Sequence, residues 1–548
     1  MREPCRGRVL AGLHLIASAL LMACSGEPAD ASGPGSMTVQ FSPGAGTFVD
    51  SQTVSLSVGN SQAEIHFTLD GSAPTPNSPI YDAPLDLAKS TRIRAIAVAP
   101  SAMAGAGAQA SMAELGPVAG QDYLRVASDA ASFSSNLPIL VIHTFESGVI
   151  NPNNEEFVPA TLELREPAAG TTALVGRASL DTRIGIHVRG ETSRDFPKKQ
   201  YAVEFRELTS DDDVDQPLLG LPADSDWVIS DPITMDRSLI RNALGFALSN
   251  RIGRYAPRTR FVEVFLADSG GDVRNQDFLG FYTLIEKIKR GDERVDVHKL
   301  LETDIAEPNL NGGYMLRIDK GANDFTAGGQ GMQFVYPDPE VMRVPARKAQ
   351  VDYVRGLVDA FAQAENAADF KQPSTGLHYS EFIDVDAWID HNIVNALTKN
   401  VDALRISAYF YKDRGGHLAA GPVWDFDRSL GTPYDDRAKA PEEWKRAGSD
   451  GSDYFGENFW KSLFRDPAFK ARYKARFLAL LSSEFAPEKL TQMVDEMVTT
   501  IGPAADRNFK RWTMSQPQGG VYQNEIALLK DFLVKRVAFI RADLAKWP

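Results

Sequence analysis

The sequence predicts an α+β protein with two folded parts, and three patterns lead to this prediction. Between residues 38 and 100, short segments alternate apolar and polar residues and are separated by turn residues, as in a small antiparallel β-sandwich. From residue 137 onward, predicted strands come first and predicted helices follow. Residues 459–548 carry mainly helical patterns. Strands and helices that follow in separate blocks are typical of α+β architectures.

Residues 1–23 have the parts of a secretory signal peptide. A start with three arginines leads into an apolar run from Val9 to Met22, which ends in Leu21-Met22-Ala23-Cys24. The run is too short to cross about 30 Å of hydrocarbon as a helix. Its end resembles the lipobox of bacterial lipoproteins, which implies cleavage before Cys24 and attachment of lipid to the Cys24 sulfur. An ordinary secretory signal is the alternative.

A lipid on Cys24 predicts an exported protein anchored in the cell envelope. Since Ser25 follows the cysteine in place of aspartate, we expect the outer membrane if the organism has two membranes. Cleavage removes Cys5, the other cysteine of the chain, so the mature chain forms no internal disulfide. Residues 24–37 are rich in Pro, Gly and Ser, and are predicted to be a flexible tether.

Composition and charge exclude several classes of function. The formal net charge of −14 argues against nucleic acid as a partner. The motifs HExxH, GxSxG, GxxxxGK[ST] and paired CxxC do not occur, and no histidines are spaced to share a metal. Any reaction must therefore depend on carboxylates, hydroxyls and cations.

The predicted β-sandwich, residues 38–100, has strands at 38–41, 52–58, 64–69 and 92–98. The run Ile65-His66-Phe67-Thr68-Leu69-Asp70-Gly71-Ser72, with Tyr81, resembles the chitobiase/β-hexosaminidase C-terminal-type domain. This resemblance implies an immunoglobulin-like accessory domain without catalytic residues. Glycan contact and a plain spacer are both open as its role.

The main part is predicted to span residues 137–548, after a linker at 101–136. A helix is predicted for Arg237 to Ile252, where apolar residues recur at helical spacing. Asn524 is expected to cap the last helix. Alternating runs predict strands at 137–142, 183–189, 201–205, 261–266 and 281–286. The last helix is expected to bury Ile526, Leu529, Phe532, Leu533, Val537, Ile540 and Leu544.

The densest group of candidate catalytic residues lies at 384–431. Asp384 is expected to cap a helix that ends near Asn400-Val401-Asp402. A predicted hairpin over 406–420 follows, and Asp425-Phe426-Asp427 comes soon after it. The order helix, acidic loop, hairpin, acidic loop is that of a protein-kinase catalytic core, where one aspartate faces the substrate hydroxyl and another binds Mg²⁺. Aspartates that only cap turns are the alternative.

Further motifs resemble the spore coat protein H (CotH) kinase family, and they occur in the order of that family. They are His187-Val188-Arg189-Gly190-Glu191-Thr192-Ser193, Phe196-Pro197-Lys198-Lys199-Gln200-Tyr201, Asp236-Arg237-Ser238, Gly280-Phe281-Tyr282 and Pro422-Val423-Trp424-Asp425-Phe426-Asp427. The resemblance implies an atypical bilobal protein-kinase-like domain. It also implies ATP and Mg²⁺ or Mn²⁺ as cofactors, and serine and threonine hydroxyls of extracytoplasmic proteins as acceptors.

The resemblance assigns two roles residue by residue. Asp402 matches the catalytic aspartate of the family, and Asp425 matches its metal-binding aspartate. Asp427 is a further metal candidate, because in a regular strand it would share a face with Asp425. A turn-capping role for Asp427 remains the alternative.

Four residues are candidates for binding the nucleotide. The cations Arg189, Lys198 and Lys199 precede or open a strand, where a positive charge can neutralise phosphate. Alternation in that strand points one lysine inward, and we favour Lys198. Glu286 closes an apolar strand and would pair with a lysine or lie beside the adenine. Solvent-exposed lysines and an ordinary edge glutamate are the alternatives.

Some features depart from ordinary protein kinases. The chain has no GxGxxG loop, and the predicted helix at 237–252 contains no glutamate. Ser407 stands where an ordinary kinase has a metal-binding asparagine. The sequence therefore leaves two functions: a lipid-anchored kinase for a protein of the envelope or surface, and a non-catalytic surface lipoprotein for adhesion or envelope binding.

Overall fold

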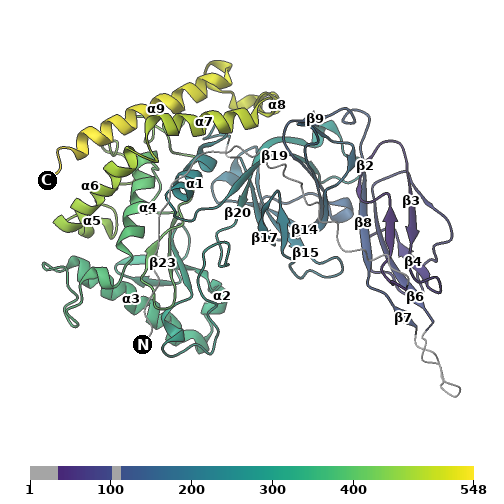
Figure 1. Ribbon diagram of the computed structural model, residues 1–548, viewed down its shortest axis with the longest axis horizontal. Helices are drawn as coiled ribbons and strands as arrows, with labels where there is room; N and C mark the ends of the chain where they lie inside the picture. Colours follow the sequence, from purple (N-terminus) through teal and green to yellow (C-terminus); the bar gives the residue numbers. More distant parts are fainter. Residues whose placement is uncertain (1–34, 101–112, 232) are drawn as a thin grey trace, which may run out of the picture.

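The computed structural model describes residues 35–100, 113–231 and 233–548. It mixes helices and sheets, with the N-terminal sheets at one end, a barrel in the middle and most helices at the other end (Figure 1). Within the described residues, no helix is both long and apolar enough to cross a membrane. The predicted signal peptide, the predicted lipidation site Cys24 and most of the predicted tether lie outside these residues.

Two sheets form the N-terminal part. The first has three strands in the order β1 (Gln40–Ser42), β3 (Gln52–Ser57), β5 (Leu85–Leu87). The second has six strands in the order β13 (Gly176–Arg177), β2 (Gly46–Phe48), β8 (Ala119–Arg125), β6 (Thr91–Ala99), β4 (Glu64–Thr68), with β7 (Glu114–Leu115) paired to β6. Side chains from both sheets, among them Val54, Ile65 and Ile93, form one buried cluster. The alternation in the sequence reflects this shared core.

The second sheet extends past residue 100, where the predicted sandwich ends. β8 pairs antiparallel with β6 and parallel with β2. β13 comes from the main part of the chain and forms the edge of the same sheet beside β2. Residues 114–125 therefore belong to the sheet, whereas we predicted a linker over 101–136. Their partners are distant in sequence, so no local pattern marks them as part of the domain.

Buried polar contacts join the N-terminal sheets to the barrel. Asp122 on β8 accepts from Arg94 Nη1 at 2.6 Å on its own sheet. Its backbone N–H donates to Asp181 Oδ2 at 2.9 Å, and its second carboxylate oxygen accepts from the Thr161 hydroxyl. Asp181 and Thr161 lie on barrel strands, so the two parts share a buried interface.

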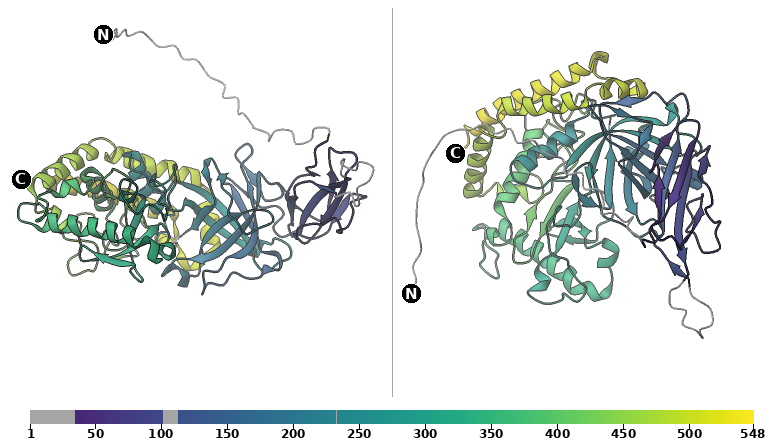
Figure 2. Two further views of the ribbon diagram at one scale, coloured as in Figure 1. Left: turned by 90° about the horizontal axis from the view of Figure 1, so that it is seen from below. Right: turned by 45° about the vertical axis from the view of Figure 1, so that its right-hand side comes forward.

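Seven strands close the barrel (Figure 2). Their order is β10 (Ile139–His143), β11 (Val158–Arg165), β14 (Leu180–Arg189), β15 (Gln200–Arg206), β18 (Asp226–Ser230), β20 (Phe278–Glu286), β19 (Thr259–Ala267). The parallel pair β10 and β19 closes the ring. Inward side chains such as Ile184, Phe205 and Val264 are fully buried. The five strands predicted after residue 136 are all confirmed here.

Shorter strands pair outside the barrel. β9 (Ser134–Ser135) pairs with β12 (Thr172–Ala173), and β16 (Gln216–Leu218) pairs with β17 (Leu221–Asp224). Helix α1 (Arg241–Arg251) lies between the barrel and the helical part, and it begins later than the predicted Arg237. Leu239 has a positive φ of 66°, which a right-handed helix does not allow, so the helix cannot include residues 237–239. Asp236 instead accepts from the N–H groups of Ser238 and Arg241.

The helical part contains a five-stranded sheet of its own. Its order is β22 (Phe325–Ala327), β23 (Gln330–Tyr336), β21 (Tyr314–Ile318), β24 (Ala408–Lys412), β25 (Ala419–Ala420). Around it lie α2 (Pro339–Met342), α3 (Lys348–Asn366), α4 (Val385–Thr398), α5 (Trp460–Leu463), α6 (Pro467–Leu481), α7 (Pro487–Ile501), α8 (Ala504–Arg511) and α9 (Tyr522–Leu544). Asp384 caps α4 by accepting from Ala387 N, as predicted.

The last helix buries the predicted apolar face but begins earlier than expected. All seven predicted core residues from Ile526 to Leu544 are buried. Val521 occupies the N-cap position, and Asn524 lies in the first turn with its side chain donating to Gln518 O at 2.9 Å. The predicted cap at Asn524 is therefore wrong. At the other end of this helical layer, α8 contacts barrel strand β20.

Candidate functional site

A cavity of about 810 Å³ lies between the barrel and the helical part. Barrel residues of β14, β15, β18 and β20 and the loop after β14 form one wall. The loops after α4, β21 and β25 form the other wall. The cavity thus brings together the two acidic loops of the sequence, because Asp402, Asp425 and Asp427 all line it.

Asp402 lies just after the end of α4. Lys399 terminates the helix with a positive φ of 51°, and Asn400 follows it. The Asn400 side chain accepts from Asp402 N at 3.3 Å and donates to the carbonyls of Trp424 and Asp425 at 3.2 and 3.0 Å. One buried amide therefore fixes the first acidic loop against the second.

The second acidic loop is held from the side of α1. Phe426 N donates to Asn242 Oδ1 at 2.7 Å, and the Phe426 ring packs on Gly245. A Cβ at Gly245 would lie 2.3 Å from that ring, so only glycine fits there. With Phe426 pointing inward, the flanking Asp425 and Asp427 reach the cavity. Asp425 has a positive φ of 63°, an uncommon conformation for a non-glycine residue.

Asp425 and Asp427 are two neighbouring carboxyl groups whose ionisation is linked. Burial raises the pKa of Asp425, and burial together with the Asp425 charge raises the pKa of Asp427 well above its ordinary value. Two adjacent carboxyl groups without a cation cannot both ionise easily. Within the described residues, no three His, Cys, Asp or Glu side chains are grouped so as to hold a metal by themselves.

Arg189 ends β14 and lines the opposite wall. Its guanidinium lies 5.8 Å from the centroid of the Trp424 ring. Burial lowers the pKa of Arg189, although an arginine stays protonated. The loop that follows turns at Gly190, where φ is +94° and a Cβ would lie 2.0 Å from Ser193 Oγ. Thr192 of this loop accepts from Lys320 Nζ at 3.4 Å, across the cavity mouth.

Lys198 does not line the cavity. Its side chain is 1% exposed, and its ammonium group pairs with Asp231 and donates to Phe281 O at 2.6 Å and Asn508 Oδ1 at 2.8 Å. Burial lowers the pKa of Lys198 to about 8 and raises that of Asp231 to about 6. The predicted inward direction of Lys198 is therefore found, but all its contacts lie inside the protein, between the barrel and α8.

Lys199 and Glu286 also lie outside the cavity lining. Lys199 Nζ donates to Arg194 O at 2.6 Å and so supports the loop after β14. Glu286 is fully buried, accepts from Arg258 Nε at 2.8 Å and forms an ion pair with Arg294 Nη1 at 3.0 Å. These contacts fix the loops beside β20. Of the four nucleotide candidates, Arg189 therefore lines the same cavity as the three predicted aspartates. The other three candidates lie outside the cavity lining.

Other residues that the sequence analysis did not single out line the cavity. Asp319 directly follows β21, and its Oδ1 accepts from Ser407 N at 3.4 Å. Arg317, Lys320, Arg405 and Arg437 are close by in the lining. An aspartate directly after the apolar run Tyr314-Met315-Leu316 and Ile318 is the one signal that could have marked Asp319. Arg437 lies in a long stretch without periodicity, where no pattern marks it.

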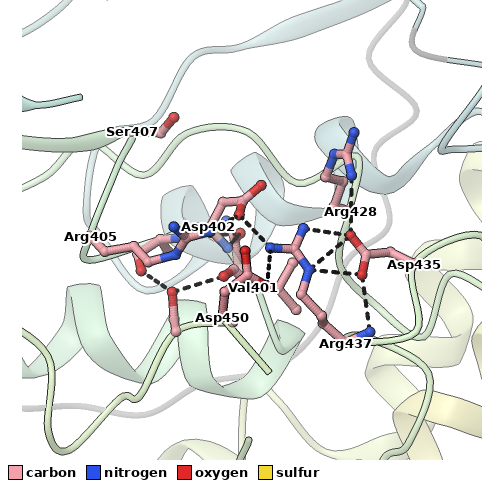
Figure 3. A network of polar contacts seen from close by, with 12 residues as sticks. Val401, Asp402, Arg405, Ser407, Arg428, Asp435, Arg437 and Asp450 are labelled. Carbon is pink, nitrogen blue, oxygen red and sulfur yellow. Dashed lines mark hydrogen bonds and ion pairs between the residues drawn. The ribbon is translucent and has the colours of Figure 1, made fainter. Parts of the chain in front are cut away.

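Asp402 is the centre of a network of ion pairs (Figure 3). Arg405 Nη2 lies 2.5 Å and Arg437 Nη1 3.1 Å from the same oxygen, Asp402 Oδ1. Arg437 also pairs with Asp435, through Nη2 at 2.6 Å and Nε at 2.9 Å. Figure 3 shows Arg437 between the two carboxylates. Arg437 thus orients Asp402 from outside the loop that carries Asp402 and Arg405.

Comparisons with known families agree with the motifs. Residues 43–106 match the chitobiase/beta-hexosaminidase C-terminal domain. Residues 186–540, more than half of the chain, match the family described as CotH kinase protein, and this match includes every aspartate of the cavity. No curated protein matches the chain significantly. The chain belongs to the CotH kinase protein family.

Proposed function

We propose that this protein is an atypical protein kinase that transfers the γ-phosphate of ATP to serine or threonine hydroxyls of a protein of the cell envelope or surface. The observation that carries the proposal is the convergence of Asp402, Asp425, Asp427 and Arg189 on one cavity. Phosphoryl transfer needs positioning and charge stabilisation more than covalent chemistry. Asp402 on one loop, the Asp425 and Asp427 pair on the other, and the positive charge of Arg189 can supply positioning and charge stabilisation.

In this proposal, the barrel and the helical part correspond to the two lobes of a kinase-like fold. The loop after β14, with Gly190 and Thr192, covers the phosphates, and Arg189 neutralises part of their charge. Lys320 contacts this loop from the other side of the cavity, which supports its role as a cover. Lys198, Lys199 and Glu286 then act by holding the walls rather than by touching the nucleotide.

Asp425 and Asp427 fit the binding of a divalent cation. Burial raises both pKa values, and the Asp425 charge adds to the shift of Asp427, so a divalent cation beside them would favour the ionised pair. Mg²⁺ is usually bound by one or two carboxylates together with substrate phosphates and waters, so a site without a third acidic ligand is expected. When bound, Mg²⁺ or Mn²⁺ would stabilise the phosphate charge that develops during transfer.

Asp402 is the group that accepts the proton of the acceptor hydroxyl. The Asn400 side chain fixes its distance from the metal-binding loop, because it bonds to both loops. Cys24 and the preceding apolar run support a location outside the cytoplasm, with lipid holding the protein at the membrane. The residues 35–125 would then lie between the membrane and the kinase domain, as a spacer or a glycan contact.

The proposal is tested by nucleotide binding and by phosphate transfer with the same preparation. Calorimetry should show ATP binding that depends on Mg²⁺ or Mn²⁺, and labelled ATP should transfer phosphate to a generic acceptor protein or to the kinase itself. Asp495→Asn, an exposed change on α7, should behave as the wild type. A folded wild-type protein that neither binds ATP nor transfers phosphate would favour the non-catalytic adhesion protein instead.

A further inference from the structure

Arg437 forms ion pairs with three carboxylates. Its guanidinium lies 3.1 Å from Asp402, 2.6 Å from Asp435 and 3.4 Å from Asp450. The Asp435 contact is bidentate, since Nε and Nη2 bond to its two oxygens. Bidentate pairing fixes the plane of the guanidinium, and this plane directs Nη1 toward Asp402.

The position of Arg437 is set by the protein and not by the reacting groups. Asp435 also accepts from Arg437 N at 3.0 Å and from Arg428 Nη1 at 3.3 Å, so it is itself held. The hydrogen bonds to Asp435 raise the pKa of Arg437, and the nearby Asp402 and Asp435 charges add to the shift. Arg437 is therefore a permanent, oriented positive charge beside Asp402.

The segment that carries Arg437 is anchored at both ends. Thr432 Oγ1 donates to Met235 O at 2.6 Å, next to α1, and Ser452 N donates to Val401 O at 2.8 Å, next to Asp402. This segment follows the metal-binding loop in the chain. A change in the conformation of this segment would move Arg437. The ion pair between Arg437 and Asp402 therefore couples the segment to Asp402.

We propose that Arg437 is a positioning residue that holds Asp402 Oδ1, so that the other carboxylate oxygen, Oδ2, faces the acceptor hydroxyl. Both arginine contacts to Asp402 use Oδ1, which leaves Oδ2 for the acceptor. In the transfer, the acceptor oxygen forms a bond to the γ-phosphorus, and its proton passes to Asp402 Oδ2. The bond from the γ-phosphorus to the bridging oxygen breaks, and ADP leaves. This inference rests on the proposed kinase function.

The test uses the full mature chain and several variants at position 437 and its support. Arg437→Gln should lower kcat on the order of 10²-fold, the loss expected from a small misplacement of a reacting group. Mg·ATP affinity should change little, because Arg437 does not belong to the proposed metal or phosphate contacts. Arg437→Lys should recover part of the rate by restoring the charge. Asp435→Asn should resemble Arg437→Gln, because it removes the anchor of Arg437.

Chemical rescue separates a charge effect from a structural effect. Added guanidinium should raise the rate of Arg437→Ala, whereas urea, which is neutral and of similar shape, should not. Arg446→Gln is the matched control, because Arg446 pairs with Asp436 and does not line the cavity. It should keep the wild-type rate.

The outcomes distinguish a failure of the positioning role alone from a failure of the proposed kinase function. Active wild type with equally active Arg437→Gln would overturn the positioning role and leave the kinase function intact. A faster Arg437→Gln would also overturn it, because Arg437 would then block the acceptor. A wild type that binds Mg·ATP but phosphorylates no hydroxyl would overturn the kinase function and this inference together.

Discussion

The side-chain amide of Asn400 donates to the backbone carbonyl of Asp425 at 3.0 Å, so a single residue ties the two acidic loops of the cavity together. Asn400 is 1% exposed, and its amide also reaches the Trp424 carbonyl at 3.2 Å. The separation between Asp402 and Asp425 therefore depends on a residue that itself reacts with nothing.

Asn400→Asp should lower both stability and phosphate transfer. The new carboxylate cannot donate to the carbonyls of Trp424 and Asp425, and an unsatisfied buried polar group costs about 1–3 kcal/mol. The free energy of unfolding, measured with denaturant, should fall by this amount, and the transfer rate should fall with it. Asn524→Asp on the exposed side of α9 is the control. Full activity in a destabilised Asn400→Asp would show that the loops keep their spacing without this amide.

Asp402→Asn and Asp425→Asn should fail in different ways. Asp402→Asn removes the proposed proton acceptor, and a positioned general base contributes about 10²–10⁴-fold to a rate. Its Mg·ATP affinity should remain close to that of the wild type. Asp425→Asn removes a proposed charged metal ligand and should weaken metal-dependent ATP binding itself. Calorimetry and labelled phosphate transfer measure both effects, and equal activity of Asp402→Asn and the wild type would remove Asp402 from the mechanism.

Arg189→Met and Lys198→Met should have different effects, because we expect Arg189 to bind phosphate and Lys198 to stabilise the fold. Arg189 lines the cavity, so its loss should weaken ATP binding with little change in stability. Lys198 is buried against Asp231, and breaking a buried pair from one side costs about 3–5 kcal/mol. The double variant Lys198→Met/Asp231→Leu should regain most of that loss. Stable Lys198→Met with poor ATP affinity would instead return Lys198 to the nucleotide site.

His391 should make the protein less stable in acid. Burial lowers the pKa of His391 to about 4, and its Nδ1 has no hydrogen-bond partner in the described structure. The unfolded chain, with an ordinary histidine pKa near 6.5, binds the proton first, so stability should fall as pH decreases from 6.5 toward 4. Denaturant titrations across this range should show the slope, and His391→Gln should reduce it. The exposed His417→Gln should not.

Cys24→Ala tests the lipid anchor that the sequence predicts. The variant should appear in the soluble envelope fraction or remain unprocessed, whereas Cys5→Ala should keep the wild-type distribution. Membrane fractionation with metabolic labelling by a fatty acid measures both results. A processed Cys24→Ala that still partitions fully with membranes would contradict the anchor.

Much of the fold could be predicted because its signals are local. The barrel strands alternate between the core and the outside, and α4 has a capping aspartate directly before its apolar positions. β8 and β13 could not be predicted, since their hydrogen bonds go to strands far away in the chain. The start of α1 was misplaced because Leu239 and Ile240 continue the helical spacing although the backbone turns at Leu239.

The candidate site shows the same limit. The order of helix, hairpin and acidic loops points to Asp402 and Asp425, and the cavity contains both. The direction of Lys198 follows from strand alternation, but its pairing depends on Asp231 and Asn508, which no spacing connects to it. Arg437 reaches Asp402 across a loop of irregular structure. Contacts of this kind become visible only when the chain is folded.

The edge strand β13 has a consequence for the exchange of modules between proteins. Gly176 and Arg177 lie between barrel strands β11 and β14 in the chain but complete the N-terminal sheet, and a Cβ on Gly46 would lie only 2.4 Å from the Gly176 carbonyl. A chimera cut at the end of the matched domain, residue 106, would separate β2 and β6 from β8 and β13. Recombination at that point would leave two incomplete folds, so a functional exchange would have to move the accessory domain together with its barrel.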